Sequence, residues 1–117
     1  MAALSSKAGG MSALVNQFQT GEKPHGTEIG KTSVQVGAVR YRQCCRLYFD
    51  TDGFFLLIKY IFKRHPAIFI PWKEVKECRN SSFFGRKAME LELNDAELPS
   101  IRIYENDFKQ NQFYQCN

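Results

Sequence analysis

The strongest constraint on the fold is the turn signal Asp50-Thr51-Asp52-Gly53, which separates two segments with strand patterning. Residues 39–49 alternate, with arginines on one face and apolar side chains on the other. Residues 54–62 are apolar on both faces except at Lys59, and their aromatic content favours a strand. An Asp-Gly turn between two such segments predicts an antiparallel hairpin. The second strand is then expected to contact the interior on one side and an N-terminal helix or another subunit on the other.

Shorter strands are expected throughout the rest of the chain. Residues 87–93 alternate between apolar and acidic side chains. Pro71 ends a short strand, and residues 81–86 are expected to form a loop. The predicted strands are 32–36, 39–49, 54–62, 67–70, 72–80, 87–93 and 101–103. The fold class is therefore mainly β, with seven antiparallel strands.

Two helices are expected beside the sheet. Apolar residues recur at i, i+3, i+4 and i+7 from Met11 to Phe18, so a helix is expected from residue 11 to about residue 20, before Gly21. Asn106 or Asp107 is expected to cap a short C-terminal helix.

The chain is long enough, at 117 residues, to bury one core without metal or disulfide support. We expect a flexible arm over residues 1–10 and a single domain over residues 11–117, with its β core at about residues 30–105.

The charge is unevenly distributed. Residues 40–87 carry eleven Lys and Arg against four Asp and Glu, whereas residues 88–117 carry two basic residues against six acidic ones. This asymmetry can attract an anionic partner, although a solvated surface of mixed charge explains it as well. A net charge of +4 is low for a nucleic-acid-binding protein, so nucleic acid is not expected as a partner.

The pattern of Cys and His gives no support for a metal site. The four Cys form no C-x-x-C pair, and His25 and His65 are not spaced as zinc ligands. Reduced thiols and a cytoplasmic location are expected, with a disulfide left open. The N-terminus lacks the apolar run of a signal peptide, and no stretch is long enough to span a bilayer. No cofactor motif or catalytic motif is present, so we do not expect an enzyme.

The order of turns and apolar residues resembles that of pleckstrin-homology-like domains, including GRAM-type variants. His65–Val75 is also similar to small uncharacterised bacterial proteins of that fold. The matching positions are Leu47, Phe49, Gly53, Phe54, Leu56, Ile70, Pro71, Trp72, Glu74, Val75, Gly85, Met89, Leu91 and Leu93.

This resemblance implies a partly open, seven-stranded barrel or sandwich with one end plugged by a helix. The family plug is a long C-terminal helix, and here the N-terminal helix is expected to take its place. Some family members bind phosphoinositides and many bind proteins. The family's basic lipid-binding cluster between the first two strands is matched only loosely by residues 37–42.

Two groups of basic residues are candidate sites for anions or lipid headgroups. One comprises Lys63, Arg64 and His65, which either contact phosphate groups or keep a loop soluble beside an apolar strand. The other comprises Arg40 and Arg42, which either extend a basic patch or, together with Arg46, pair with Glu90 and Glu92.

Three aromatic residues are candidates for an interface. Trp72 either contacts a partner or fills a gap in the core. Phe83 and Phe84 either insert into a membrane or a partner's pocket, or fold back over the core. The sequence thus predicts a non-catalytic binding module that contacts a protein partner or itself. The alternative is a peripheral membrane module that binds anionic headgroups.

Overall fold

The computed structural model of the chain describes residues 10–59 and 66–114. Its elements are α1 (Met11–Phe18), β1 (Thr27–Val36), β2 (Val39–Phe49), β3 (Gly53–Ile58), β4 (Ile68–Pro71), the 3-10 turn η2 (Trp72–Glu74), β5 (Val75–Phe83), β6 (Arg86–Leu93), β7 (Ile101–Tyr104) and α2 (Glu105–Phe108).

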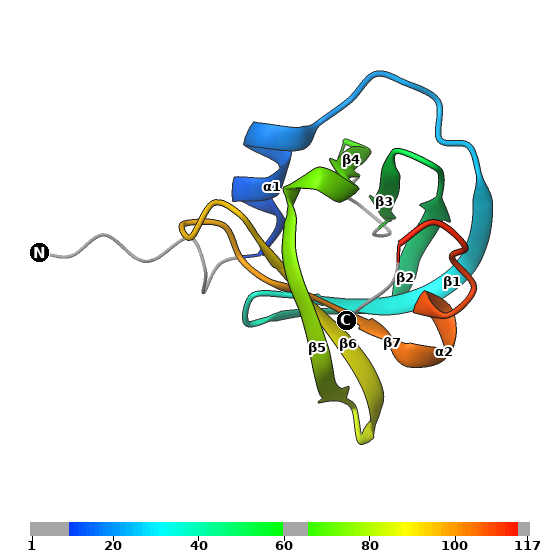
Figure 1. The fold of residues 1–117 in the computed structure, drawn as a ribbon, viewed down its shortest axis with the longest axis vertical. Helices are drawn as coiled ribbons and strands as arrows, with labels where there is room; N and C mark the ends of the chain where they lie inside the picture. The colour runs from blue at the N-terminus through cyan, green and yellow to red at the C-terminus, as the bar shows by residue number, and fades with distance from the viewer. Residues whose placement is uncertain (1–9, 60–65, 115–117) are drawn as a thin grey trace, which may run out of the picture.

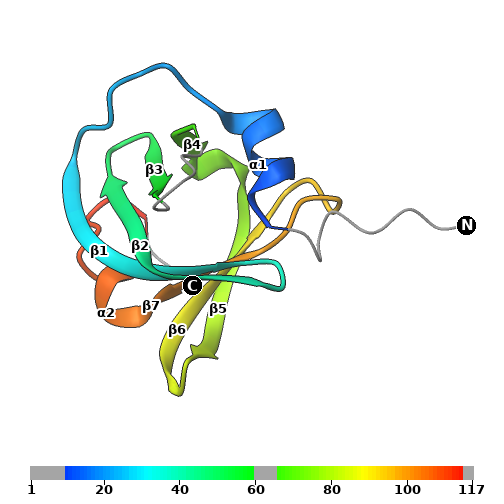
Figure 2. The same ribbon diagram turned by 180° about the vertical axis from the view of Figure 1, so that it is seen from behind.

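The seven strands form one antiparallel sheet in the order β4-β3-β2-β1-β7-β6-β5. The sheet curls into a half-barrel, with β4 and β5 at its edges and η2 connecting them (Figures 1 and 2). The prediction of a mainly β fold with seven antiparallel strands, one N-terminal helix and a short C-terminal helix is confirmed.

Several predicted boundaries were wrong. Strand β1 begins at Thr27, five residues earlier than expected, and α1 ends at Phe18 because Gln19 is extended. Strand β5 continues to Phe83, so the loop expected over residues 81–86 shrinks to a two-residue turn. Residues 60–62 of the third predicted strand lie outside the described residues.

The predicted cap of the C-terminal helix was also wrong. The cap position of α2 is Tyr104, and no side chain caps the helix. The Asp107 carboxylate instead accepts a hydrogen bond from the Thr32 hydroxyl on β1.

The turn after β2 requires glycine because another strand passes close to it. A Cβ atom on Gly53 would lie 2.3 Å from the carbonyl oxygen of Ile70 on β4. Gly53 is paired with Pro71, and its carbonyl accepts a hydrogen bond from the Asp50 N–H at 2.8 Å. The Asp-Gly signal therefore marks both the hairpin and the close approach of β4.

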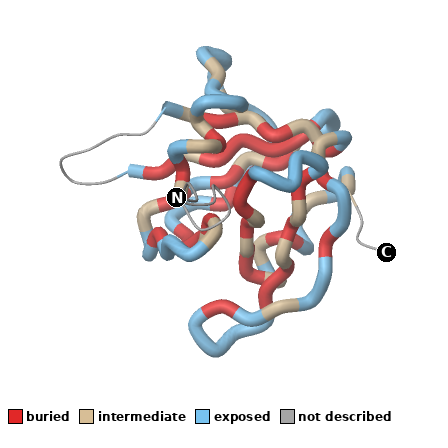
Figure 3. The backbone as a smooth tube through the Cα atoms, turned by 90° about the vertical axis from the view of Figure 1, so that its left-hand side faces the viewer, coloured by how far each residue is buried: buried red, intermediate tan, exposed pale blue. Residues whose placement is uncertain are grey.

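The core occupies the inside of the curl. On β2, Tyr41, Cys45, Leu47 and Phe49 are buried, with more exposed residues between them. Buried and more exposed stretches also follow one another along the rest of the chain (Figure 3). The inward residues of β3, β6 and β7 complete the same cluster. Strand alternation thus separates the chain into an apolar interior and a polar outer face.

The two helices cover opposite ends of β2. The backbone N–H of Met11, at the start of α1, donates to the Tyr41 hydroxyl at 3.0 Å, near the start of β2. Phe108 of α2 packs edge-on against Phe49, at the end of β2. Met11 and Leu14 are buried, so α1 covers one end of the half-barrel.

The second face of β3 is covered by an unexpected pair of residues. Phe55 is fully buried, and its ring lies 4.7 Å from the Phe69 ring of β4 and 5.0 Å from the His25 imidazole. The expectation that α1 or another subunit covers this face was therefore wrong for Phe55. The connection formed by residues 19–26 brings His25 there. Near the start of this connection, the Thr20 N–H donates a hydrogen bond to the Ala67 carbonyl at 3.0 Å.

His25 links this connection to the β2–β3 turn. Its ring nitrogens lie 2.9 Å from the Glu22 carboxylate and 2.9 Å from the Asp50 carboxylate. The hydrogen bond with Glu22 raises the pKa of His25, and the charge of Asp50 adds to this effect. The protonated imidazole is therefore favoured in the folded chain.

We expect the stabilising effect of His25 to depend on pH. Because its folded pKa is raised, the stabilisation is complete below the unfolded value of about 6.5 and is lost as the pH rises through the folded value. The Tm difference between the wild type and His25→Gln should therefore shrink as the pH rises above about 6.5. Thermal unfolding followed by circular dichroism measures it. Lys23→Gln, in the same connection, should show no such trend, and a His25 effect that grows with pH would contradict the assignment.

Candidate functional site

The described arginines fall into two groups. Three of the six pair with glutamates: Arg46 lies 3.0 Å from Glu28, Arg79 lies 3.0 Å from Glu77, and Arg102 lies 3.2 Å from Glu90. The other three are Arg40, Arg42 and Arg86, and they form no ion pair within residues 10–59 and 66–114.

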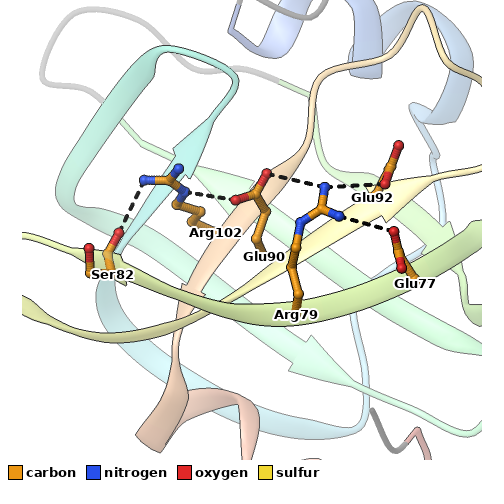
Figure 4. Close-up of polar contacts among 6 residues, drawn as sticks. All are labelled: Glu77, Arg79, Ser82, Glu90, Glu92 and Arg102. Carbon is orange, nitrogen blue, oxygen red and sulfur yellow. Dashed lines mark hydrogen bonds and ion pairs between the residues drawn. The ribbon is translucent and has the colours of Figure 1, made fainter. Parts of the chain in front are cut away.

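The paired group forms a network across β5, β6 and β7. Arg79 also contacts Glu92 at 3.2 Å, and Arg102 donates to the Ser82 carbonyl at 3.1 Å (Figure 4). Burial alone would raise the pKa of Glu92, but its hydrogen bond with Glu77 and the charges of Lys76 and Arg79 lower it overall. This network fixes the β5–β6 hairpin against β7.

The network also corrects a predicted pairing. One of the two interpretations paired Glu90 and Glu92 with Arg40, Arg42 and Arg46, but β1 and β7 lie between β2 and β6 in the sheet. The glutamates of β6 therefore pair with arginines of the adjacent strands β5 and β7.

The unpaired group stacks on aromatic rings. The guanidinium carbons of Arg40 and Arg42 each lie 5.1 Å from the centroid of the Phe84 ring. The guanidinium carbon of Arg86 lies 4.1 Å from the centroid of the Tyr104 ring. These distances fall within the range of a cation–π interaction, about 6 Å.

The rings themselves form a continuous stack. The Phe84 and Phe83 rings are 4.5 Å apart, and Phe83 and Tyr104 are 5.1 Å apart. Phe83, Ala88 and Tyr104 form a buried cluster separate from the main core. We call the whole assembly the arginine–aromatic surface, and its residues are Arg40, Arg42, Phe83, Phe84, Arg86, Ala88 and Tyr104.

This surface lies on the outer side of the sheet. Ala88 and Tyr104 alternate along their strands with Met89 and Ile103, which belong to the core. The β6–β7 pairing covers only residues 88–91 of β6, so the β5–β6 hairpin extends beyond it. The turn of that hairpin can therefore meet β2 although two strands separate β2 from β6.

Phe84 adopts a backbone conformation that rarely suits its residue type. It occupies the first position of the Phe84-Gly85 turn with φ of +53°, and Gly85 follows with φ of +74°. Two positive φ values are typical of a hairpin turn that prefers Asn-Gly. A left-handed conformation costs a non-glycine residue about 1–2 kcal/mol. Phe84 is also 39% exposed, so burial does not account for the choice of residue.

A polar depression adjoins the Arg86 end of this surface. Its volume is about 270 Å³, and strand irregularities shape it where Lys31 and Gln43 have φ of +48° and +54°. The Gln43 N–H donates to the buried Ser33 hydroxyl at 2.8 Å, in place of a regular ladder bond. The depression is lined by Gly30, Lys31, Thr32, Ser33, Gln43, Arg86, Tyr104 and Asp107.

The structure brings together some predicted site residues and separates others. Arg40, Arg42 and Phe84 converge, although the sequence placed them in different candidate sites. Lys63, Arg64 and His65 lie outside the described residues.

Two residues predicted at an interface are buried instead. Phe83 is covered within the ring stack, so it offers no free surface of its own. Trp72 is only 8% exposed: its ring stacks on Tyr114 at 5.1 Å, and its Nε1–H donates to the Asp50 carbonyl at 2.8 Å. Trp72 therefore fills the core, in agreement with the second interpretation of its sequence position.

Sequence reasoning missed Arg86 and Tyr104. No local pattern reveals them, because Arg86 was placed in a loop and Tyr104 beyond the last predicted strand. Their contact depends on the pairing of β6 with β7, which joins Ala88 to Tyr104.

Among the described residues, the environment of Cys45 opposes ionisation of its thiol. Cys44 and Cys45 are free, and burial raises the pKa of Cys45, with the neighbouring Cys44 adding to this effect. Cys78 is disulfide-bonded, so the disulfide that the sequence left open is present and reduced thiols do not describe every cysteine. Across residues 10–59 and 66–114, no three His, Cys, Asp or Glu side chains gather as metal ligands.

Comparisons with known proteins give no relative for this chain: no family model, no curated protein and no solved structure matches it. Among the described residues, no helix has the length and apolarity needed to cross a membrane.

We expect Phe84→Asn to leave the fold intact. Asn accepts the left-handed turn conformation, which offsets the loss of the Phe83 stacking and the two cation–π contacts, each worth about 0.5–1.5 kcal/mol. The free energy of unfolding should therefore fall by less than about 3 kcal/mol, as measured by urea denaturation. Phe113→Asn, at another exposed ring, provides the control. A loss above about 3 kcal/mol would show that Phe84 serves mainly stability.

Proposed function

We propose that this chain is a non-catalytic binding domain of the pleckstrin-homology-like class that recognises a protein partner, or a second copy of itself, through the arginine–aromatic surface. One observation carries the proposal. Three arginines that lack a carboxylate partner among the described residues stack on two rings, and one of these rings belongs to an exposed phenylalanine in a strained turn.

The composition of the surface supports a role in protein recognition. Arginine and aromatic residues are enriched among the residues that contribute most to protein–protein binding. Stacking on a ring also restricts the flexible arginine side chain before a partner arrives, which lowers the entropy lost on binding. Arg79 and Arg102 already contact glutamates, so a partner could bind them only by breaking those ion pairs.

The chemistry of the remaining groups supports a non-catalytic role. The raised pKa of Cys45 keeps its thiol protonated near neutral pH, and a thiol is a weaker nucleophile than a thiolate. His25 is held between two carboxylates that keep it in a structural role.

The assignment to the pleckstrin-homology-like class rests on the sequence resemblance together with the curled sheet of seven antiparallel strands. The covered end of the half-barrel at α1 also agrees with that class. The short α2 departs from it, since its four residues are far fewer than a long C-terminal helix would have.

We expect a photo-cross-linking phenylalanine analogue at position 84 to join this chain to a discrete partner in extracts of its source cells. The ring is retained, so its reactive group faces whatever the surface binds. Adducts should be lost in Arg40→Gln/Arg42→Gln and absent when the analogue replaces Phe113. Mass spectrometry of the adducts distinguishes a foreign protein from a second copy of the chain.

Two results would contradict this proposal. Adducts of the same pattern from positions 84 and 113 would show that the surface is not selective. Adducts that persist without Arg40 and Arg42 would show that these arginines are not part of the recognition site. Light scattering of the purified chain at rising concentration tests self-association independently.

A peripheral membrane role is the second candidate. The observation that favours it is the exposed Phe84 at a hairpin turn between two arginines, since an aromatic ring can enter a membrane interface while cations contact anionic headgroups.

Under this alternative, the chain should sediment with phosphatidylserine-rich vesicles at low salt and not with phosphatidylcholine vesicles. Phe84→Asn and Arg40→Gln/Arg42→Gln should both reduce the bound fraction, whereas Arg46→Gln should not, because Arg46 is already paired. Failure to sediment at about 50 mM salt would exclude this function, since electrostatic attraction is strongest at low ionic strength.

A further inference from the structure

We propose that the occupant of the arginine–aromatic surface is an extended acidic peptide segment of a protein, with carboxylate side chains on both sides of an apolar residue. This inference rests on the proposed binding function and adds the chemistry of the partner.

The first argument is charge complementarity. Arg40, Arg42 and Arg86 are exposed and lack an ion pair among the described residues, whereas the other three described arginines contact glutamates at 3.0–3.2 Å. Two of the unpaired guanidinium groups share one ring and therefore hold like charges close together. An anion between them relieves that repulsion, and a carboxylate matches the planar donor pattern of arginine.

The second argument is the distribution of the cations. Arg40 and Arg42 stack at the Phe84 end, and Arg86 stacks at the Tyr104 end. Two ring-to-ring steps of 4.5 and 5.1 Å separate these ends. A single phosphate group or a single headgroup requires cations that converge on one point. Separate single charges on an elongated ligand fit this arrangement better, and alternate residues of an extended peptide are about 7 Å apart on one side.

The third argument is the exposed apolar ring of Phe84. Phe84 is exposed beside Arg40 and Arg42, and the ring stack runs from it through the buried Phe83 to Tyr104 and Arg86. An apolar side chain of the ligand can therefore cover the Phe84 ring and exclude water from the flanking ion pairs. Charged contacts contribute more when water is excluded from them.

The fourth argument is shape. The polar depression of about 270 Å³ begins at Arg86 and offers Lys31, Ser33 and Gln43 to a ligand. A peptide can place a side chain or a backbone amide in this depression, whereas a flat membrane surface cannot enter it. Asp107 also lines the depression, so its negative charge favours an uncharged group of the peptide there.

The test measures fluorescence anisotropy of a labelled peptide in which a leucine has a glutamate two residues before it and another two residues after it, so that all three side chains lie on one side of the extended chain. The wild-type chain should bind it at about 50 mM salt and more weakly at about 300 mM salt. Arg40→Gln/Arg42→Gln should weaken binding by about tenfold or more, and Arg86→Gln and Phe84→Asn should weaken it severalfold. Arg46→Gln, on the same face of β2, should stay within about twofold because its charge is already paired.

Control peptides separate the contributions of charge and apolar contact. A peptide with glutamine in place of glutamate should not bind, and one with serine in place of leucine should bind more weakly. Equal effects of Arg46→Gln and Arg40→Gln/Arg42→Gln would overturn the inference, because binding would then reflect general charge. Absence of binding to the wild-type chain at low salt would also overturn it.

A phosphoserine peptide and anionic vesicles complete the test. Binding of either one through the same arginines, without binding of the glutamate peptide, would replace the acidic peptide with that ligand. If the cross-links from position 84 persist and depend on Arg40 and Arg42 while the glutamate peptide fails, the partner chemistry is wrong and the proposed function stands. If both fail, the proposed function fails as well.

Discussion

The alternation of side chains along β2 is the constraint on which the rest of the structure depends. Its buried residues, Tyr41, Cys45, Leu47 and Phe49, form part of the core, and its outward positions include the exposed Arg40 and Arg42. A shift of one residue in register would exchange these two sets and bury the charges. The same strand contacts both helices, through Tyr41 at one end and Phe49 at the other. The position of the arginines is therefore fixed by the packing of the interior.

The arginine–aromatic surface shows where the sequence departs from what stability alone would select. Phe84 occupies a left-handed turn position that favours Asn or Gly, yet it is exposed and accepts two guanidinium groups. Local rules are most often broken where a protein binds or reacts. The network of Arg79, Arg102 and Glu90 holds the hairpin that presents this ring. The salt bridges thus hold the hairpin whose turn contains Phe84 in a left-handed conformation.

Much of the fold could be predicted from the sequence, because strand alternation and turn residues are local signals. The bounds of β2 were predicted correctly, whereas the early start of β1 and the extension of β5 to Phe83 were not, since cross-strand pairing continues both strands through polar residues. The candidate site was only partly predictable. Arg40 and Phe84 were each identified, but their meeting depends on the curl of the sheet and the short pairing of β6 with β7. Arg86 and Tyr104 carried no local signal at all.

Trp72 gives the end of the half-barrel beside α2 an optical property of its own. It is the only tryptophan in the chain, and its indole lies among Phe49, Phe54, Phe108 and Tyr114. Tyr114 and Phe108 belong to the C-terminal segment, so emission excited selectively from the indole reports whether that segment is docked. The arginine–aromatic surface contains no such chromophore. Changes in the tryptophan emission of the intact chain therefore report whether Phe108 and Tyr114 are packed against Trp72.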